Sequence, residues 1–282
     1  MDRFYILTNT SKDPDHSFTR GVMDYLRKSG CMCEEVHTWQ EQISDQAGPD
    51  LKGACLLVLG GDGTVLDAAA RLKGLTLPVF AINLGTLGYL AEVERSGWKE
   101  ALDKLIRDDY ELADRMMLEG AQRGKENTAY ALNDVVISRS GSLRLISINI
   151  YVDGQFLNTI NADGVIVATP TGSTAYNLSA GGPIVEPTGD IIVITPICSQ
   201  SMYARSLVFS ASDLITLEVA HSSHGDDNEA EASFDGRRMM ILREGDRIEI
   251  RKSERFIRMI KISRQSFLQT LHKKLYRAEG LY

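Results

Sequence analysis

A glycine-rich turn with a single carboxylate follows an apolar run near residue 60. Its sequence is Gly60-Gly61-Asp62-Gly63-Thr64. Glycine lets a backbone approach a phosphate closely because no Cβ intervenes, and a following helix would offer free N–H groups. A carboxylate beside a triphosphate is unfavourable unless it helps to hold Mg²⁺ or accepts a proton from an attacking hydroxyl. The turn therefore predicts phosphate handling. The alternative is a tight turn in which Asp62 caps the helix.

A second candidate site is a loop rich in hydroxyl groups. Residues 169–183 read Thr-Pro-Thr-Gly-Ser-Thr-Ala-Tyr-Asn-Leu-Ser-Ala-Gly-Gly-Pro, directly after an apolar run. Hydroxyls and exposed backbone suit a polar ligand, and Tyr176 offers a ring for stacking. The alternative is a plain connecting loop, although a loop of this length and composition is uncommon without function.

Two adjacent polar residues interrupt an apolar run at Asn133-Asp134. Burying both requires partners. An amide and a carboxylate side by side can read an adenine edge and a ribose hydroxyl. The alternative is a bulge or a strand end.

The elements that must position these groups change in type along the chain. Residues 1–112 alternate and predict an α/β domain with a parallel sheet, which binds ligands at the carboxyl ends of its strands. We expect strands at residues 4–8, 31–36, 51–59 and 78–83, and helices at 17–28 and 64–73.

Residues 113–262 predict a second, β-rich domain that is sandwich-like, and residues 263–282 a closing helix. The expected strands are residues 110–120, 130–139, 144–152, 164–168, 191–195, 214–219 and 247–250, with turns at 152–155 and 234–237.

Composition excludes several classes of protein. The net charge of −7 argues against a general attraction to nucleic acid or an anionic membrane. No run approaches the ~18 apolar residues of a membrane span. The four cysteines predict free thiols in a reducing cytoplasm rather than a disulfide framework. A metal site can be drawn from His221, His224, Asp226 and Asp227, but we expect a polar loop there.

Together these motifs resemble those of bacterial NAD kinases. The matching segments are residues 60–64, 83–90 (Asn-Leu-Gly-Thr-Leu-Gly-Tyr-Leu), 133–134, 163–164, 169–183, 194–196, 205–208 and 267–275, in consistent order along the chain. The glycine-aspartate turn alone is shared with diacylglycerol and sphingosine-type lipid kinases and with phosphofructokinases. The Thr-Gly-Ser-Thr-Ala-Tyr stretch is more specific to NAD kinases.

The resemblance implies transfer of the ATP γ-phosphoryl group to the 2′-hydroxyl of the adenosine ribose of NAD, giving NADP. It implies Mg²⁺ or another divalent cation bound mainly through the ATP phosphates, with no protein ligand assigned. It also implies a homo-oligomer, a dimer or tetramer, and a C-terminal tail that packs back on the first domain.

Site residues follow from the same resemblance. Asp62 would accept the proton, Asn133 would read the adenine, and Asp134 would bind the ribose hydroxyls. The implied NAD contacts are Asp62, Gly63, Asn133, Asp134, Arg144, Asp163, Thr174, Ala175, Tyr176, Asn177 and Ser179, and the implied phosphate contacts are Gly60, Gly61, Gly63 and Thr64.

Two positions depart from the family pattern. Many relatives have Glu where this chain has Asp134, and Gln where it has Arg237. Two other functions remain as alternatives: a lipid or sphingoid kinase sharing the glycine-aspartate turn, and a dinucleotide sensor without catalysis. The first predicts an apolar acceptor pocket, and the second predicts NAD binding without turnover.

Overall fold

The computed structural model describes residues 1–36, 52–85, 88–140, 145–220, 229–262 and 266–277. Arg144 and the His/Asp metal alternative of residues 221–227 lie outside these ranges. The chain divides into two compact units. Unit 1 comprises Met1–Asp114 and Ile257–Tyr282, and unit 2 comprises Arg115–Phe256.

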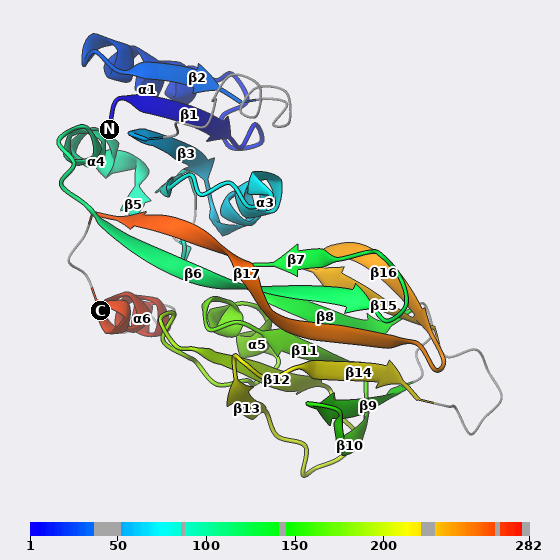
Figure 1. The fold of residues 1–282 in the computed structure, drawn as a ribbon. Coiled ribbons are helices and arrows are strands. Elements are labelled where there is room, and N and C mark those ends of the chain that lie inside the picture. The colour runs from blue at the N-terminus through cyan, green and yellow to red at the C-terminus, as the bar shows by residue number, and fades with distance from the viewer. Residues whose placement is uncertain (37–51, 86–87, 141–144, 221–228, 263–265, 278–282) are drawn as a thin grey trace. The chain divides into compact units, whose positions relative to one another are not determined.

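Unit 1 is built on a parallel sheet in the strand order β2-β1-β3-β4 (Figure 1). The strands are β1 (Arg3–Thr8), β2 (Met32–Glu35), β3 (Ala54–Gly60) and β4 (Val79–Asn83). Every residue of β3 and β4 is buried, as expected of inner strands covered on both faces. The predicted parallel sheet is therefore confirmed.

Helices complete unit 1. They are α1 (Ser17–Lys28), α3 (Asp62–Leu72), α4 (Trp98–Ile106) and α6 (Phe267–Arg277), with the short β5 (Val93–Glu94) and the 3-10 turn η1 (Arg95–Gly97) before α4. Helix α1 buries Phe18, Val22 and Leu26, which recur at helical spacing. It ends before Gly30, whose φ of +81° suits glycine.

Unit 2 contains two largely antiparallel sheets. One has the order β10-β9-β14-β17, with β6 beside β17 and β7 beside β6; the other has the order β13-β12-β11-β8-β15-β16. The first sheet is formed by β6 (Glu111–Gln122), β7 (Ala129–Ala131), β9 (Ile146–Val152), β10 (Gln155–Ala162), β14 (Ile215–Val219) and β17 (Arg247–Lys261). The second is formed by β8 (Asp134–Arg139), β11 (Gly164–Ala168), β12 (Ile191–Ile197), β13 (Leu207–Ser210), β15 (Glu229–Phe234) and β16 (Arg237–Arg243).

One hydrophobic core joins the two sheets of unit 2. Ile148 and Ile250 enter it from the first sheet, and Val135 and Val167 enter it from the second. The outer face of the second sheet packs against Ala180 of the hydroxyl-rich loop and against Val185, which follows that loop. That loop contains the 3-10 turn η2 (Thr171–Thr174) and the short helix α5 (Tyr176–Ser179). The predicted β-rich, layered architecture is confirmed.

Some expected elements were wrong in detail. The strand expected over residues 130–139 is broken at Leu132 and Asn133, between β7 and β8. The strand expected over 247–250 continues to Lys261 as β17. Strands β10, β13, β15 and β16 had not been expected. Within the described ranges, no helix combines the length and apolar character needed to cross a membrane.

Candidate functional site

Asp62 lies at the carboxyl edge of the parallel sheet of unit 1. Strand β3 ends at Gly60 and helix α3 begins at Asp62. The Asp62 carboxylate accepts the backbone N–H of Tyr89 at 2.7 Å and that of Leu90 at 3.0 Å. It makes no capping bond to α3, whose N-cap is Gly61. The helix-cap alternative is therefore wrong, and Asp62 is held by the loop that follows β4.

Gly88 makes this arrangement possible. A Cβ at Gly88 would overlap both carboxylate oxygens of Asp62. Residue 88 must therefore be glycine for the carboxylate to reach the N–H groups of Tyr89 and Leu90. In the 83–90 segment of the resemblance, Gly88 thus serves a close approach. Thr86 and Leu87 lie outside the described residues.

Thr64 is part of the packing beneath the turn. It is buried, and its hydroxyl accepts a hydrogen bond from the Asn9 side-chain amide at 3.1 Å. A Cβ on Gly60 would overlap the Thr64 side chain. Gly63, by contrast, is exposed and has open space around it. Of the expected phosphate contacts, Gly61 and Gly63 leave backbone accessible, whereas Gly60 and Thr64 are buried and pack against each other.

A cation from the C-terminal segment lies beside this edge. The Lys274 ammonium of α6 is 3.5 Å from the centroid of the Tyr89 ring, a cation–π contact. Burial lowers the pKa of Lys274, and the negative charge of Asp62 opposes that shift. Lys274 therefore places positive charge close to the candidate base.

The Asn133-Asp134 pair of unit 2 lies at the break between β7 and β8. Asp235, in the turn between β15 and β16, accepts backbone N–H groups from Leu132 at 2.8 Å, Asn133 at 2.8 Å and Asp134 at 3.3 Å. The side chains of Asn133 and Asp134 make no hydrogen bond to any other residue that the structure describes. Their polar groups are available to a ligand.

The buried carboxyl group of Asp134 and the half-buried carboxylate of Asp235 lie at this break. Burial raises the pKa of Asp134 to about 7, and the charge of Asp235 adds to the shift. Burial also raises the pKa of Asp235, but three backbone N–H groups and Arg237 oppose that shift. Because these donors stabilise the ionised form of Asp235, Asp134 is the member that holds a proton near neutrality.

The hydroxyl-rich loop exposes the ring of Tyr176, whereas internal hydrogen bonds fix the side chain of Asn177. Tyr176 is 46% exposed, and Ser179 is exposed as well. Asn177 is fully buried, and its amide donates to the carbonyls of Ser173 and Pro183 while accepting from the Thr195 hydroxyl. The Asn177 side chain therefore shapes the loop, whereas Tyr176 faces outward. Thr174 and Ala175, which directly precede Tyr176, are partly exposed.

Asp163 is held by an ion pair. Its carboxylate lies 2.9 Å from Arg139 Nε, and both side chains are partly exposed. The Asp163 carbonyl also accepts the Arg139 backbone N–H at 3.1 Å. The structure thus gives Asp163 a fixed direction at the start of β11.

Three further residues were missed by the sequence analysis. Asp235 and Lys274 are far in sequence from the groups that they contact, so no local pattern signals them. The buried Thr171 hydroxyl makes no hydrogen bond within the described part of the chain. Such a group is costly to leave unpaired, and its place in the Thr-Gly-Ser-Thr stretch was the available signal.

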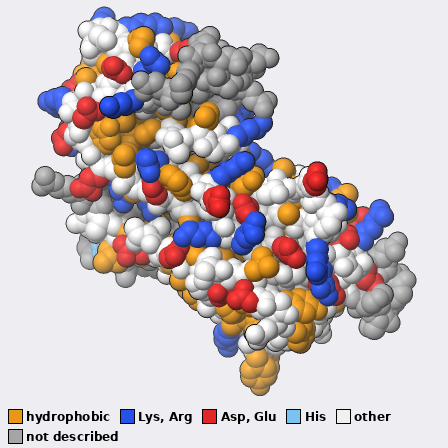
Figure 2. Space-filling view, in the orientation of Figure 1, with side chains coloured by type: hydrophobic (Ala, Val, Ile, Leu, Met, Phe, Trp, Pro, Cys, Tyr) orange, Lys and Arg blue, Asp and Glu red, His pale blue; other side chains and the backbone are white. Residues whose placement is uncertain are grey.

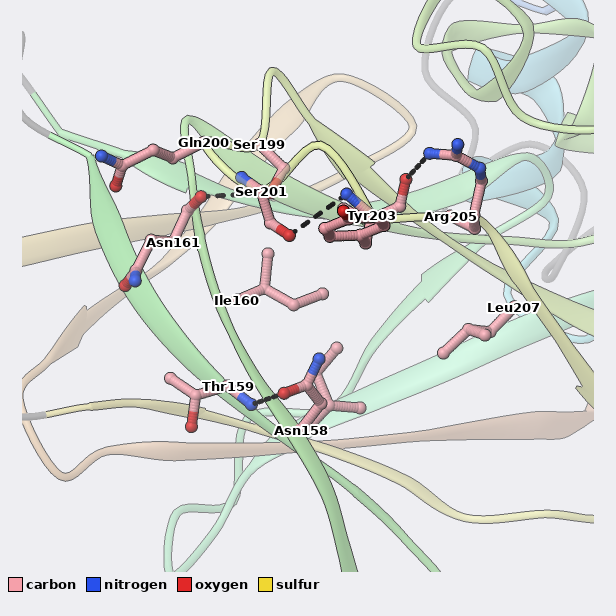
Figure 3. Close-up of a pocket in the computed structure, with 12 residues that line it drawn as sticks. Asn158, Thr159, Ile160, Asn161, Ser199, Gln200, Ser201, Tyr203, Arg205 and Leu207 are labelled. Carbon is pink, nitrogen blue, oxygen red and sulfur yellow. Dashed lines mark hydrogen bonds between the residues drawn. The ribbon is translucent and has the colours of Figure 1, made fainter.

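Unit 2 also contains a pocket of about 450 Å³ between β10 and the 199–207 segment. Figure 3 shows Asn158, Ile160, Tyr203 and Arg205 around it. The Arg205 guanidinium donates to the carbonyls of Met202 and Ala204, so it shapes the loop. No motif of the sequence predicts this pocket.

Large apolar side chains are exposed in the same two segments of the chain, β10 and residues 199–207. Tyr203 is 86% exposed, Met202 82% and Phe156 58%. Figure 2 shows hydrophobic side chains gathered at the end of unit 2 where β10 and β13 lie. Exposed apolar patches commonly mark interaction surfaces.

No cluster of three or more His, Cys, Asp or Glu side chains suitable for a metal occurs among the described residues. At the phosphate edge, Asp62 is a single carboxylate whose oxygens already accept two N–H groups. Mg²⁺ usually keeps several waters and binds through one or two carboxylates plus substrate phosphates. The edge fits an ion that arrives on phosphates and does not form a protein cage for one.

Comparison with known proteins agrees with these two units. Residues 6–110 match the family described as ATP-NAD kinase N-terminal domain, and residues 132–262 match ATP-NAD kinase C-terminal domain. An NAD kinase of Lachnospira eligens is 45% identical, with 98% of this chain and 100% of the relative covered. An NAD kinase of Agathobacter rectalis is 42% identical, with 98% and 99% covered.

Two solved structures share the fold. A yeast NADH kinase complexed with NADH has a TM-score of 0.81 at 25% identity, covering 98% of this chain and 87% of the other. An NAD kinase from Archaeoglobus fulgidus in complex with ATP has a TM-score of 0.78 at 23% identity, covering 97% and 98%. The α/β and β-rich architecture is thus shared along almost the whole chain.

Proposed function

Because this chain belongs to the NAD kinase family and is a phosphotransferase acting on NAD with ATP, we propose that Asp62 is its catalytic base. The supporting observation is the fixed Asp62 carboxylate at the carboxyl edge of the parallel sheet, held by two N–H groups. Open α/β sheets bind ligands at this edge. Asp62 would take the proton of the ribose 2′-hydroxyl as the new P–O bond forms.

The acidity of the two groups sets the timing of this step. A carboxylate is a weak base, and a ribose hydroxyl is barely acidic. Asp62 therefore cannot remove the proton in advance. It orients the hydroxyl and accepts the proton late, which is what a loose phosphoryl-transfer transition state requires. Positioning then supplies most of the rate.

We assign the acceptor nucleoside to unit 2. Asn133 and Asp134 present polar side chains that lack a described protein partner, and they suit an adenine edge and ribose hydroxyls. Tyr176 offers an exposed ring for stacking, and Asp163 provides a carboxylate fixed by Arg139 for the nicotinamide end. The backbone and side chains of Thr174, Ala175 and Ser179 would complete the contacts, and Asn177 would hold the loop that carries them.

We assign the phosphates of the donor to unit 1. Gly61 and Gly63 leave backbone accessible at the start of α3, and Lys274 supplies a cation near Asp62. Mg²⁺ or another divalent cation, carried mainly by the ATP phosphates, would neutralise their charge. The chain's own part is to orient the phosphates and to keep a single carboxylate beside them.

We also propose that an exposed apolar patch of unit 2 is covered by a second copy of this chain. The patch is formed by Phe156, Met202, Tyr203 and Val208, all more than half exposed. Sedimentation of the wild type and of Tyr203→Ser tests this: we expect a dimer or tetramer weakened by the substitution. A monomeric wild type would contradict it.

The free cysteines support a cytoplasmic location.

The comparisons favour this function over a lipid or sphingoid kinase, since the curated relatives are NAD kinases over nearly the whole chain. A sensor without catalysis would not need the fixed carboxylate of Asp62. An assay with ATP, Mg²⁺ and NAD, in which a dehydrogenase specific for NADP reports product, tests the function. NADP formation is expected. NAD binding without product from ATP or from inorganic polyphosphate would favour the sensor.

A further inference from the structure

We propose that Asp235 and Thr169 act together as positioning residues. They fix the backbone of residues 132–134, here called the corner, so that it can bind the nucleoside of the acceptor. This inference rests on the function proposed above. It concerns the backbone of residues 132–134, which lies between the turn after β15 and the start of the hydroxyl-rich loop.

Asp235 holds the corner through its N–H groups. One carboxylate oxygen accepts from Leu132 at 2.8 Å, and the other accepts from Asn133 at 2.8 Å and from Asp134 at 3.3 Å. The Asp235 backbone N–H in turn donates to the Asp134 carbonyl at 3.1 Å. Asp235 itself has a φ of +49°, which aspartate tolerates better than most residues.

Thr169 holds the carbonyls of the same segment. Its hydroxyl donates to the Leu132 carbonyl at 2.7 Å, and its backbone N–H donates to the Asn133 carbonyl at 2.8 Å. The hydroxyl also accepts the Gly172 N–H at 3.0 Å. A Cβ at Gly172 would overlap the Asn133 backbone, so the loop approaches the corner as closely as glycine allows.

Each backbone N–H and carbonyl of residues 132–134 therefore bonds to Asp235 or to Thr169. Ordinary pairing in a continuous strand would satisfy these groups without two dedicated side chains. Asp235 and Thr169 instead fix a break in the strand. The side chains of Asn133 and Asp134 are left without a described protein partner. A fixed backbone carrying unpaired polar side chains is the arrangement of a prepared binding site.

Matched substitutions separate positioning from general stability. Thr169→Val keeps the shape of the side chain and removes the hydroxyl, whereas Thr169→Ser keeps the hydroxyl. Asp235→Asn cannot accept all three N–H groups. The controls are Thr216→Val, another buried threonine of unit 2, and Asp246→Asn, whose carboxylate accepts one N–H in the turn between β16 and β17.

Steady-state kinetics with NAD and with ATP give the decisive readout. We expect Thr169→Val and Asp235→Asn to raise the KM for NAD by ~10-fold or more, while the KM for ATP stays within about twofold. Thr169→Ser and both controls should keep the KM for NAD within about twofold. A loss of stability alone would not separate the two substrates in this way.

Unchanged KM values for NAD in both Thr169→Val and Asp235→Asn would overturn the proposal, as would parallel changes for NAD and ATP. If Asp235→Asn does not fold, the Thr169→Val and Thr169→Ser pair decides. If the wild type forms no NADP, the proposed function fails. Calorimetric titration with NAD then tests whether Asp235 and Thr169 position residues 132–134 for NAD binding. Weaker NAD binding by Thr169→Val supports it, and no NAD binding by the wild type overturns it.

Discussion

The carboxylate of Asp62 accepts the backbone N–H of Tyr89 at 2.7 Å, although the two residues are 27 positions apart. This bond joins the turn after β3 to the loop after β4. It gives the carboxylate one direction and leaves it at the edge of the sheet. The proposed role of Asp62 as the catalytic base depends on this orientation of its carboxylate.

Gly88→Ala should displace the carboxylate of Asp62, because the added Cβ would overlap its oxygens. We expect turnover to fall by ~10-fold or more, and the free energy of unfolding to fall by ~1–3 kcal/mol from overpacking. Coupled assays and urea titration measure both. Gly21→Ala is the control, since Gly21 lies in α1 with open space around it. Full activity in Gly88→Ala would show that the bond to Tyr89 is not needed.

Lys274→Met should weaken ATP binding, because it removes the cation beside Asp62 and Tyr89. A partly buried charge contact of this kind is worth ~1–2 kcal/mol, about a tenfold rise in the KM for ATP. The control is Lys99→Met, which removes an exposed lysine near the Trp98 ring. Equal KM values for ATP in the two variants would argue against a role for Lys274.

Tyr176→Ala should raise the KM for NAD by ~5–150-fold, the range that corresponds to losing one base-stacking contact of ~1–3 kcal/mol. Tyr176→Phe keeps the ring and should behave like the wild type. Because the side chain is 46% exposed, thermal unfolding should hardly change in either variant. If Tyr176→Phe were as impaired as Tyr176→Ala, the hydroxyl rather than the ring would make the contact.

The pH dependence of stability should report the buried carboxyl of Asp134. Its pKa rises from an ordinary value of 3.8 to about 7 in the folded state, so the folded state holds a proton that the unfolded state has lost. The stability linked to this proton is fully present below pH 3.8 and is lost as the pH rises through 7. Wild type should therefore lose stability relative to Asp134→Asn between pH 5 and pH 8.

Urea titration of both proteins at these two pH values measures that difference. We expect it to exceed ~1 kcal/mol, since one pKa unit corresponds to about 1.4 kcal/mol. Carboxylates distant from Asp134 and Asp235 are common to both proteins and cancel in the comparison. Parallel stability curves would mean that Asp134 titrates near its ordinary pKa in the folded protein.

Helices and strands whose structure is determined by local patterns were predicted correctly from the sequence. Helix α1 begins and ends where expected, because its apolar spacing and Gly30 define it. Strand β11 was also expected at its observed bounds. Apolar runs between glycine turns identified β3 and β4, and with them the edge that carries Asp62.

Contacts distant in sequence explain what was missed. The strand expected over residues 130–139 breaks because the carboxylate of Asp235, 102 positions beyond Asn133, captures its N–H groups. Lys274 approaches Tyr89 only after the chain returns to unit 1. Strands such as β10 are largely exposed, so they lack the apolar pattern of a core strand. The site assignments carried over from the resemblance stay predictions.

The most direct test of the central claim is the rate of NADP formation by Asp62→Asn. Purified wild type, Asp62→Asn and the control Asp67→Asn, from the same helix, are assayed with saturating ATP, Mg²⁺ and NAD. We expect Asp62→Asn to lose ~2–4 decades of turnover, with a much smaller change in NAD affinity and a normal control. Turnover near that of the wild type in Asp62→Asn would contradict its role as the base.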